Sequence, residues 1–215
     1  MNTELLIAQL ANDLRPVPTG SSRTRLRLGL IWGAGIAAAA VVLWPSLGIR
    51  HDLGEAMSTG IFWVKLLYSG SLAYLGFRAL DRLSRPGPHV VHWASLLAVP
   101  LVALAAVTLL WLGAAPADSG EAFWTGSSSV QCLFYVAGLS VPVFLGLLWS
   151  LSRLAPTQLG AAGAAAGLVA GGTAATVYAL HCTESSPGFV LLWYSLGVGA
   201  ASLIGAAIGR KVLRW

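Results

Sequence analysis

Two cysteines are the residues whose type and spacing could most readily carry chemistry. Cys132 begins one apolar segment, and Cys182 immediately follows another. In an oxidising compartment two such thiols can form a disulfide, and their thiolates can instead bind a soft metal ion, with His181 and Glu184 beside Cys182 as further ligands. Because no CxxC pattern is present, the spacing leaves a structural disulfide, redox or metal sensing, and two inert thiols all open.

Motifs of the common enzyme classes do not occur in the sequence. It contains no Ser-His-Asp arrangement, HExxH, Walker loop or Rossmann fingerprint. The apolar segments carry no acidic residue that would serve a proton or ion path. We therefore expect a protein that is not an enzyme and has no resident cofactor, apart from a transient soft metal ion at the cysteine pair.

The composition places the chain in lipid. Of its 215 residues, 56% are hydrophobic and only 10% are charged, which is too apolar for an ordinary water-soluble domain. The formal net charge is +5, but the basic residues stand singly beside apolar runs and form no stripe with interleaved aromatic residues. We interpret these residues as signals of membrane topology and expect no direct binding of nucleic acid.

Six segments are long and apolar enough to cross a hydrocarbon layer as helices, each of about 20 residues. The sequence therefore predicts an all-α protein, a polytopic bundle of six transmembrane helices. The predicted spans are Leu26 to Trp44, Ile61 to Leu80, Trp93 to Leu112, Val130 to Leu151, Leu159 to Leu180 and Phe189 to Ile208.

The basic residues predict the orientation of these spans, because Lys and Arg beside a span are retained in the cytoplasm. We expect a multi-pass protein of the bacterial inner membrane with both termini in the cytoplasm and both cysteines at the outer face. Only Arg50 then lies outside, and Lys65 lies near the outer end of the second span, where its ammonium can reach the interface. The predicted cytoplasmic residues are Arg15, Arg23, Arg25, Arg27, Arg78, Arg82, Arg85, Arg153, Arg210, Lys211 and Arg214.

The fifth and sixth spans carry small residues at helical spacing. Gly163, Gly167 and Gly171 recur every fourth residue, and Gly205 and Gly209 repeat the spacing in the sixth span. Such a face lets a neighbouring backbone approach closely. We expect this face to pack within the bundle. Homodimerisation through the same face is the alternative that the sequence leaves open.

A short amphipathic helix is predicted before the first span, in the cytoplasm. Leu6, Leu10 and Leu14 recur every fourth residue, and Pro16 and Pro18 end the helix. The chain thus divides into a cytoplasmic helix and tether at 1–25 and a six-helix transmembrane domain at 26–215. An exposed leucine stripe can dock into a groove on a partner or lie on the bilayer, and the residues alone favour neither.

Residues along nearly the whole chain resemble those of the NrsF-type anti-sigma factors, negative regulators of SigF. These are bacterial inner-membrane proteins of six helices that hold an extracytoplasmic-function sigma factor inactive. The matching residues are Glu4 to Ile7, Asp13 to Val17, Phe62 to Leu66, Cys132, Leu180 to Cys182, Ser186 to Phe189, Trp193 and Tyr194, Gly205 to Arg210, and Trp215.

The resemblance implies a membrane-bound anti-sigma factor that releases its sigma factor on envelope stress, such as heavy metals or a redox change. By position, Cys132 and Cys182 would be the sensor thiols. The residues themselves give Cys132, Cys182 and His181 as the ligands of a soft metal ion, as the alternative to a disulfide. The N-terminal segment would bind the sigma factor. A rival from another class is a membrane thiol-disulfide oxidoreductase or a small-solute carrier. The predicted sigma-binding residues are Leu6, Leu10, Asp13, Leu14, Arg15 and Pro16.

Overall fold

The computed structural model describes residues 3–12, 20–44, 47–85, 93–114 and 120–214, and these ranges contain helices and loops but no strand. The all-α prediction is therefore confirmed. The helices are α1 (Thr3–Asn12), α2 (Ser21–Leu43), α3 (Leu53–Ser58), α4 (Gly60–Leu83), α5 (Trp93–Ala114), α6 (Gly120–Thr125), α7 (Ser129–Leu151), α8 (Leu159–Tyr178), α9 (Pro187–Phe189) and α10 (Ser195–Val212), with a π-helical turn, Val190–Tyr194, between the last two.

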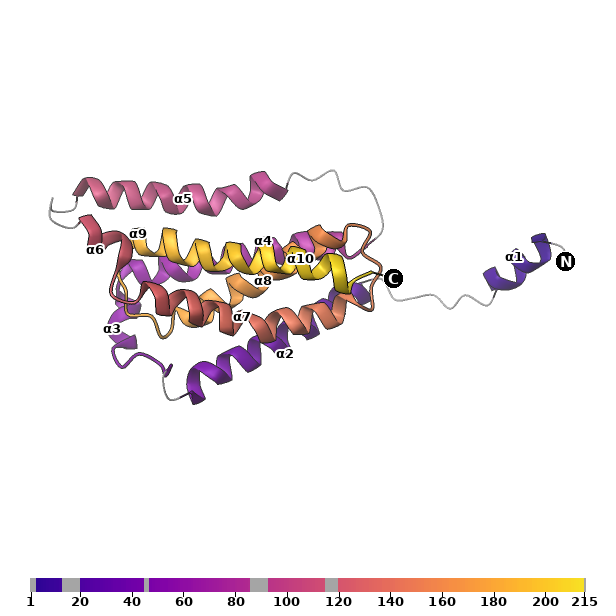
Figure 1. Cartoon of the computed structure of the whole chain (residues 1–215), viewed down its shortest axis with the longest axis horizontal. Coiled ribbons are helices and arrows are strands. Elements are labelled where there is room, and N and C mark those ends of the chain that lie inside the picture. The colour runs from indigo at the N-terminus through magenta and orange to yellow at the C-terminus, as the bar shows by residue number, and fades with distance from the viewer. Residues whose placement is uncertain (1–2, 13–19, 45–46, 86–92, 115–119, 215) are drawn as a thin grey trace.

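Long helices lie side by side and run between two ends of a bundle (Figure 1). At one end α2 and α8 begin and α4, α7 and α10 end; we call it the arm end, because α1 precedes α2 there. At the other end α2 and α8 end and α4 and α7 begin; we call it the thiol end, because both cysteines lie there. The short helices α3, α6 and α9 all belong to the thiol end.

The centre of the bundle is α8, which packs against α10, α4 and α7. Twelve of its 20 residues are buried, and nearly all of them are glycine or alanine. A Cβ atom at Gly163 would overlap the carbonyl oxygen of Gly205, and one at Gly167 would overlap that of Ala201. The predicted small-residue face thus packs against α10 of the same chain.

Five helical stretches of the described chain are long and apolar enough to cross a membrane: Ser21–Leu43, Ser95–Ala114, Phe123–Leu151, Leu159–Tyr178 and Pro187–Val212. They correspond to five of the six predicted spans. The remaining one, predicted at 61–80, forms the 24-residue helix α4 but is not among the five. Its charged and hydroxyl side chains, among them Lys65, Ser69 and Asp81, lower its hydropathy.

The outer surface of the bundle is apolar, as contact with lipid requires. Large side chains of four long helices face outward, and Trp32 is 72% exposed, Leu110 76%, Phe134 71% and Leu203 75%. A water-soluble protein of this size rarely exposes so continuous an apolar surface. The structure therefore agrees with a protein that has a hydrocarbon layer around it.

One prediction concerns the contact between α8 and α10. Gly205→Ala would press a methyl group against the backbone of α8 at Gly163, so we expect the free energy of unfolding to fall by about 1 to 3 kcal/mol. Gly199→Ala in the same helix is the matched control, because a Cβ there meets nothing within 4 Å. Unfolding in mixed micelles of rising SDS content, followed by circular dichroism, measures both. Equal stabilities would contradict the packing described.

Candidate thiol site and N-terminal arm

Both cysteines lie buried at the thiol end, on two different elements. Cys132 is in the first turn of α7 and is 0% exposed, and Cys182 is in the α8–α9 loop (residues 179–186) and is 2% exposed. Both are free thiols and belong to one buried cluster. Their sulfur atoms lie within range of electrostatic interaction. The structure thus brings together the two residues that the sequence singled out.

Aromatic rings of α7, α8 and the π-helical turn surround the loop. The ring of Tyr178 stacks at 5.6 Å from that of His181, 5.8 Å from that of Tyr135 and 6.2 Å from that of Tyr194, measured between centroids. The Tyr194 hydroxyl is fully buried beside Cys182 and has no hydrogen-bond partner among the described residues. Aromatic rings therefore form one wall of the thiol site.

The predicted metal-ligand set is not assembled in this conformation. Nδ1 of His181 lies 2.9 Å from the carbonyl oxygen of Gly48, so this nitrogen carries the proton and donates it. Among the described residues no three His, Cys, Asp or Glu side chains are grouped as ligands for a metal ion. The binding of a soft metal by Cys132, Cys182 and His181 stays a prediction.

The prediction that Lys65 reaches the interface was wrong. Lys65 is only 1% exposed, because its side chain points from α4 into the α8–α9 loop. Its ammonium donates hydrogen bonds to the carbonyl oxygens of Cys182, at 3.3 Å, and Glu184, and it lies 3.8 Å from the Cys182 sulfur. Lys65 is thus part of the thiol site.

A signal for this position was present in the sequence. Lys65, Ser69, Leu72 and Gly76 recur at intervals of four and three residues, and all four are buried on the face of α4 that meets α8. Membrane helices turn small and polar residues toward their neighbours and large apolar ones toward lipid. The small and polar residues on the same face of the helix therefore indicated that Lys65 is buried in protein. Its distance from the end of the span gave no such indication.

A second cation, Arg50, binds the same loop and lines the same small cavity as Lys65. Arg50 follows α2; its backbone N–H donates to the carbonyl oxygen of Leu180 at 3.2 Å, and its Nη1 donates to that of Cys182 at 3.2 Å. Its Nε and Nη2 donate to the two carboxylate oxygens of Asp52, at 2.7 and 2.6 Å. This pairing lowers the pKa of Asp52 to about 2. Two cations thus bind the backbone around Cys182.

The carboxylate of Glu184 joins the α8–α9 loop to the start of α7. Its Oε1 accepts hydrogen bonds from the Ser127 backbone N–H and hydroxyl, both at 2.7 Å, and from the Ser128 hydroxyl at 3.1 Å. Burial raises the pKa of this carboxyl, but the hydrogen bonds and the charge of Lys65 outweigh burial, and the net pKa lies below its ordinary value of 4.5. Glu184 therefore ties the segment that carries Cys182 to the helix that carries Cys132.

At the arm end a buried carboxylate fastens α2 to α4. Nε and Nη2 of Arg23 donate to one oxygen of Asp81 at 3.0 and 2.8 Å, and Nη2 of Arg85 donates to the other at 3.0 Å. The Asp81 side chain is only 5% exposed. Since Arg23 lies in the first turn of α2, this network fixes the point from which the N-terminal segment departs.

The N-terminal arm, residues 1–20, is described only in part. Helix α1 lies apart from the bundle, beyond the arm end (Figure 1), and its Leu6 and Ile7 are 40% and 56% exposed. Leu10 lies in the same helix. The other predicted sigma-binding residues, Asp13, Leu14, Arg15 and Pro16, lie outside the described residues.

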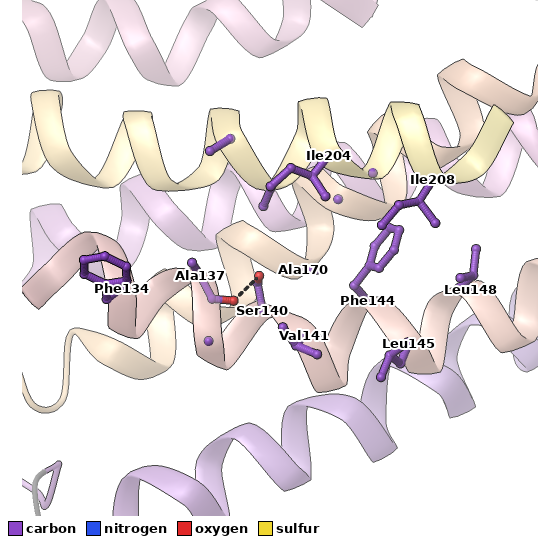
Figure 2. Close-up of a pocket in the computed structure, with 15 residues that line it drawn as sticks. Phe134, Ala137, Ser140, Val141, Phe144, Leu145, Leu148, Ala170, Ile204 and Ile208 are labelled. Carbon is purple, nitrogen blue, oxygen red and sulfur yellow. Dashed lines mark hydrogen bonds between the residues drawn. The ribbon is translucent and has the colours of Figure 1, made fainter. Parts of the chain in front are cut away.

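A groove of about 520 Å³ lies between α7, α8 and α10, and neither cysteine lines it (Figure 2). Among its 15 lining residues Ser140 alone carries a polar side chain, and its hydroxyl donates to the Ala137 carbonyl oxygen at 2.7 Å. The groove thus presents hydrocarbon surface and no free donor or charge, so it does not favour the carrier of a polar solute.

A family model described as a negative regulator of sigma F, NrsF, matches residues 10–215. The chain belongs to the NrsF family. It is 40% identical over 218 residues to a probable anti-sigma-F factor NrsF of Azospira oryzae, and 39% identical over 220 residues to the anti-sigma-F factor NrsF of Caulobacter vibrioides. Each similarity covers the whole of both chains. No solved structure matches this chain.

The membership confirms the resemblance found in the sequence. These relatives are named as regulators, which agrees with the expectation of a protein that is not an enzyme. The paired thiols and the exposed helix α1 belong to two different ends of one helical bundle in this family member.

The Glu184 contacts predict a pH dependence. Because the folded-state pKa is lowered, the carboxylate stabilises the fold fully above its ordinary value of 4.5, and this contribution is lost as the pH falls through the folded-state value. We expect wild type to be more stable than Glu184→Gln near neutral pH and this difference to shrink below about pH 4.5. Unfolding in micelles across pH measures it, with Glu55→Gln, an exposed residue at the same end, as the control. A stability difference between wild type and Glu184→Gln that does not vary with pH would contradict the stabilising role of the Glu184 carboxylate.

Proposed function

We propose that this chain is a membrane-bound anti-sigma factor that holds an extracytoplasmic-function sigma factor inactive at the cytoplasmic face of the bacterial inner membrane. A change in the state of Cys132 and Cys182 at the outer face releases the sigma factor. The observation that carries this proposal is the arrangement of one pair of buried thiols and one exposed apolar arm at opposite ends of a helical bundle, in a family of negative regulators of sigma F.

The orientation in the membrane is supported by the distribution of charge. Ten described basic residues lie at the arm end, whereas the described part of the thiol end has Arg50 and Lys65. Lys and Arg beside membrane helices stay in the cytoplasm, so the arm end faces inward. Both termini lie inside only if the number of crossings is even. Five spans are α2, α5, α7, α8 and α10, so helix α4 must cross as the sixth. The arm-end residues are Arg23, Arg25, Arg27, Arg78, Arg82, Arg85, Arg153, Arg210, Lys211 and Arg214.

The arm supplies the surface for the sigma factor. A ten-residue helix is marginal in water unless its apolar face packs against something, and in α1 the side chains of Leu5, Leu6 and Ile7 are exposed. A groove of a sigma factor that takes up this face would both order the helix and cover its apolar residues. The bilayer surface is the competing occupant of this apolar face.

A signal can pass between the two ends along α4 and α8. Helix α4 binds the Cys182 loop through Lys65 near one end and Arg23 of α2 through Asp81 near the other. Backbone contacts without intervening side chains join α8 to α10 and α4, so a shift of one helix displaces its neighbours. A coupling of about 1 to 3 kcal/mol between the thiols and the arm would change sigma occupancy about 5-fold to 150-fold.

The arm is tested by affinity purification of the full chain from its native membranes, with mass spectrometry of sigma subunits. We expect Leu6→Asp to lower the recovered sigma factor at least about tenfold, because it places a charge in the apolar contact. Ala8→Asp is the matched control, since its position lies on the opposite face of the same helix. Deletion of residues 1–18 should abolish recovery. Sigma factor that remains bound to the deleted chain would contradict the role of the arm.

The thiols are tested by transcription from a promoter that the sigma factor serves. We expect Cys132→Ser and Cys182→Ser to lose most of the rise that Cd²⁺ or the thiol oxidant diamide causes in wild type, because neither serine can bind a soft metal or form a disulfide. Immunoblots of membranes check that the variants accumulate as wild type does. Unchanged basal and induced transcription in both variants would defeat the sensing role.

A further inference from the structure

The groove between α7, α8 and α10 is lined by hydrocarbon. The lining residues of α8, Gly167 and Ala170, are small and buried, and larger side chains such as Phe144 of α7 and Ile208 of α10 stand beside them (Figure 2). The hydroxyl of Ser140 is already hydrogen-bonded within α7. Because the lining offers water no free polar side chain, an apolar occupant fills the groove better than water does.

The length of the groove suits a single hydrocarbon chain. Along α7 its lining runs from Phe134 to Leu148, a rise of about 21 Å at about 1.5 Å per residue. The hydrocarbon of one bilayer leaflet is about 15 Å deep, half of a core of about 30 Å. A lipid acyl chain that enters from one leaflet therefore has the wall of the groove beside it over its whole length.

A helix of a second copy of the chain fits the groove less well. Membrane helices approach each other closely through small residues, and here such residues are already in contact within the chain. A Cβ atom at Gly163 would overlap the carbonyl oxygen of Gly205, and one at Gly167 would overlap that of Ala201. A narrow, flexible acyl chain needs no such close approach of backbones.

Basic side chains stand where the groove opens at the arm end. Lys211 follows Ile208 by three positions on α10 and lies about one turn further along the same face. Arg153 follows α7, five positions after Leu148, and its Cζ lies 5.1 Å from the ring centroid of Trp149. Lys211 and Arg153 are exposed, and neither forms an ion pair among the described residues. The opening therefore suits an anionic group.

We propose that this groove binds an anionic phospholipid, with one acyl chain between α7 and α10 and the phosphate between Lys211 and Arg153. The helix ends that carry these two cations lie beside each other, because Leu151 and Leu213 line one small cavity. Basic pockets between membrane helices are typical sites for anionic headgroups. The binding needs a lipid but no sigma factor, so it stands apart from the proposed regulation of transcription.

Lipid retention by the purified full-length chain in nonionic micelles tests the headgroup contact. Native mass spectrometry compares palmitoyl-oleoyl phosphatidylglycerol with phosphatidylcholine of the same acyl chains, supplied in equal amounts. We expect wild type to retain at least about tenfold more of the anionic lipid, and Lys211→Gln to lower this preference about fivefold. Arg82→Gln is the matched control, because Arg82 is exposed at the same end on α4, which does not line the groove. Equal retention of the two lipids by wild type, or an equal fall in both variants, would overturn the proposal.

A second substitution tests the groove without a change of charge. Gly138 lines the groove and a Cβ there meets nothing within 4 Å, so Gly138→Leu fills the space without a backbone clash. We expect it to lower the retained phosphatidylglycerol at least about fivefold, because the acyl chain loses its contacts with the wall. Gly199→Leu is the control, since its Cβ is equally unhindered and the residue lies outside the groove. Equal retention by both leucine variants would contradict the site. A dimer in wild type that Gly138→Leu dissolves would assign the groove to a second copy and overturn the proposal.

Discussion

The cost of leaving backbone polar groups unpaired in hydrocarbon is the constraint on which this architecture depends. A helical chain crosses lipid in unbroken helices, because each N–H and C=O then finds its partner within the segment. Each long helix of the described bundle therefore carries the polypeptide from one end to the other. The cysteines and the arm are separated by the full length of the helices as a direct result.

Helix α4 carries buried charged side chains as well as apolar ones. It buries a cation, Lys65, and an anion, Asp81, which lie 16 positions apart and so about 24 Å along the helix. Neither charge faces lipid: one is held by the carbonyl oxygens of the Cys182 loop and the other by Arg23 and Arg85. Buried charges of this kind make discrete contacts that are either formed or broken, which suits an element that links two sites.

The sequence predicted the long helices and the segregation of basic residues, because apolar length and flanking charge are local properties of a segment. It also placed both cysteines at one end, since that follows from counting spans. It did not predict the partners of Lys65 and Arg50, because these are backbone carbonyl oxygens of a loop more than 100 residues away along the chain. The short helices α3 and α6 were missed as well, since six residues are too few to show a period.

The central claim, that thiols and arm face opposite sides of a membrane, is tested most directly by labelling single cysteines in intact spheroplasts with an impermeant maleimide. In a chain with Cys132→Ser and Cys182→Ser, Thr183→Cys marks the thiol end and Ser152→Cys marks the arm end, and both positions are exposed. We expect Thr183→Cys to be labelled in intact spheroplasts and Ser152→Cys to be labelled only after the membrane is opened. Labelling of both positions from the same side would contradict it.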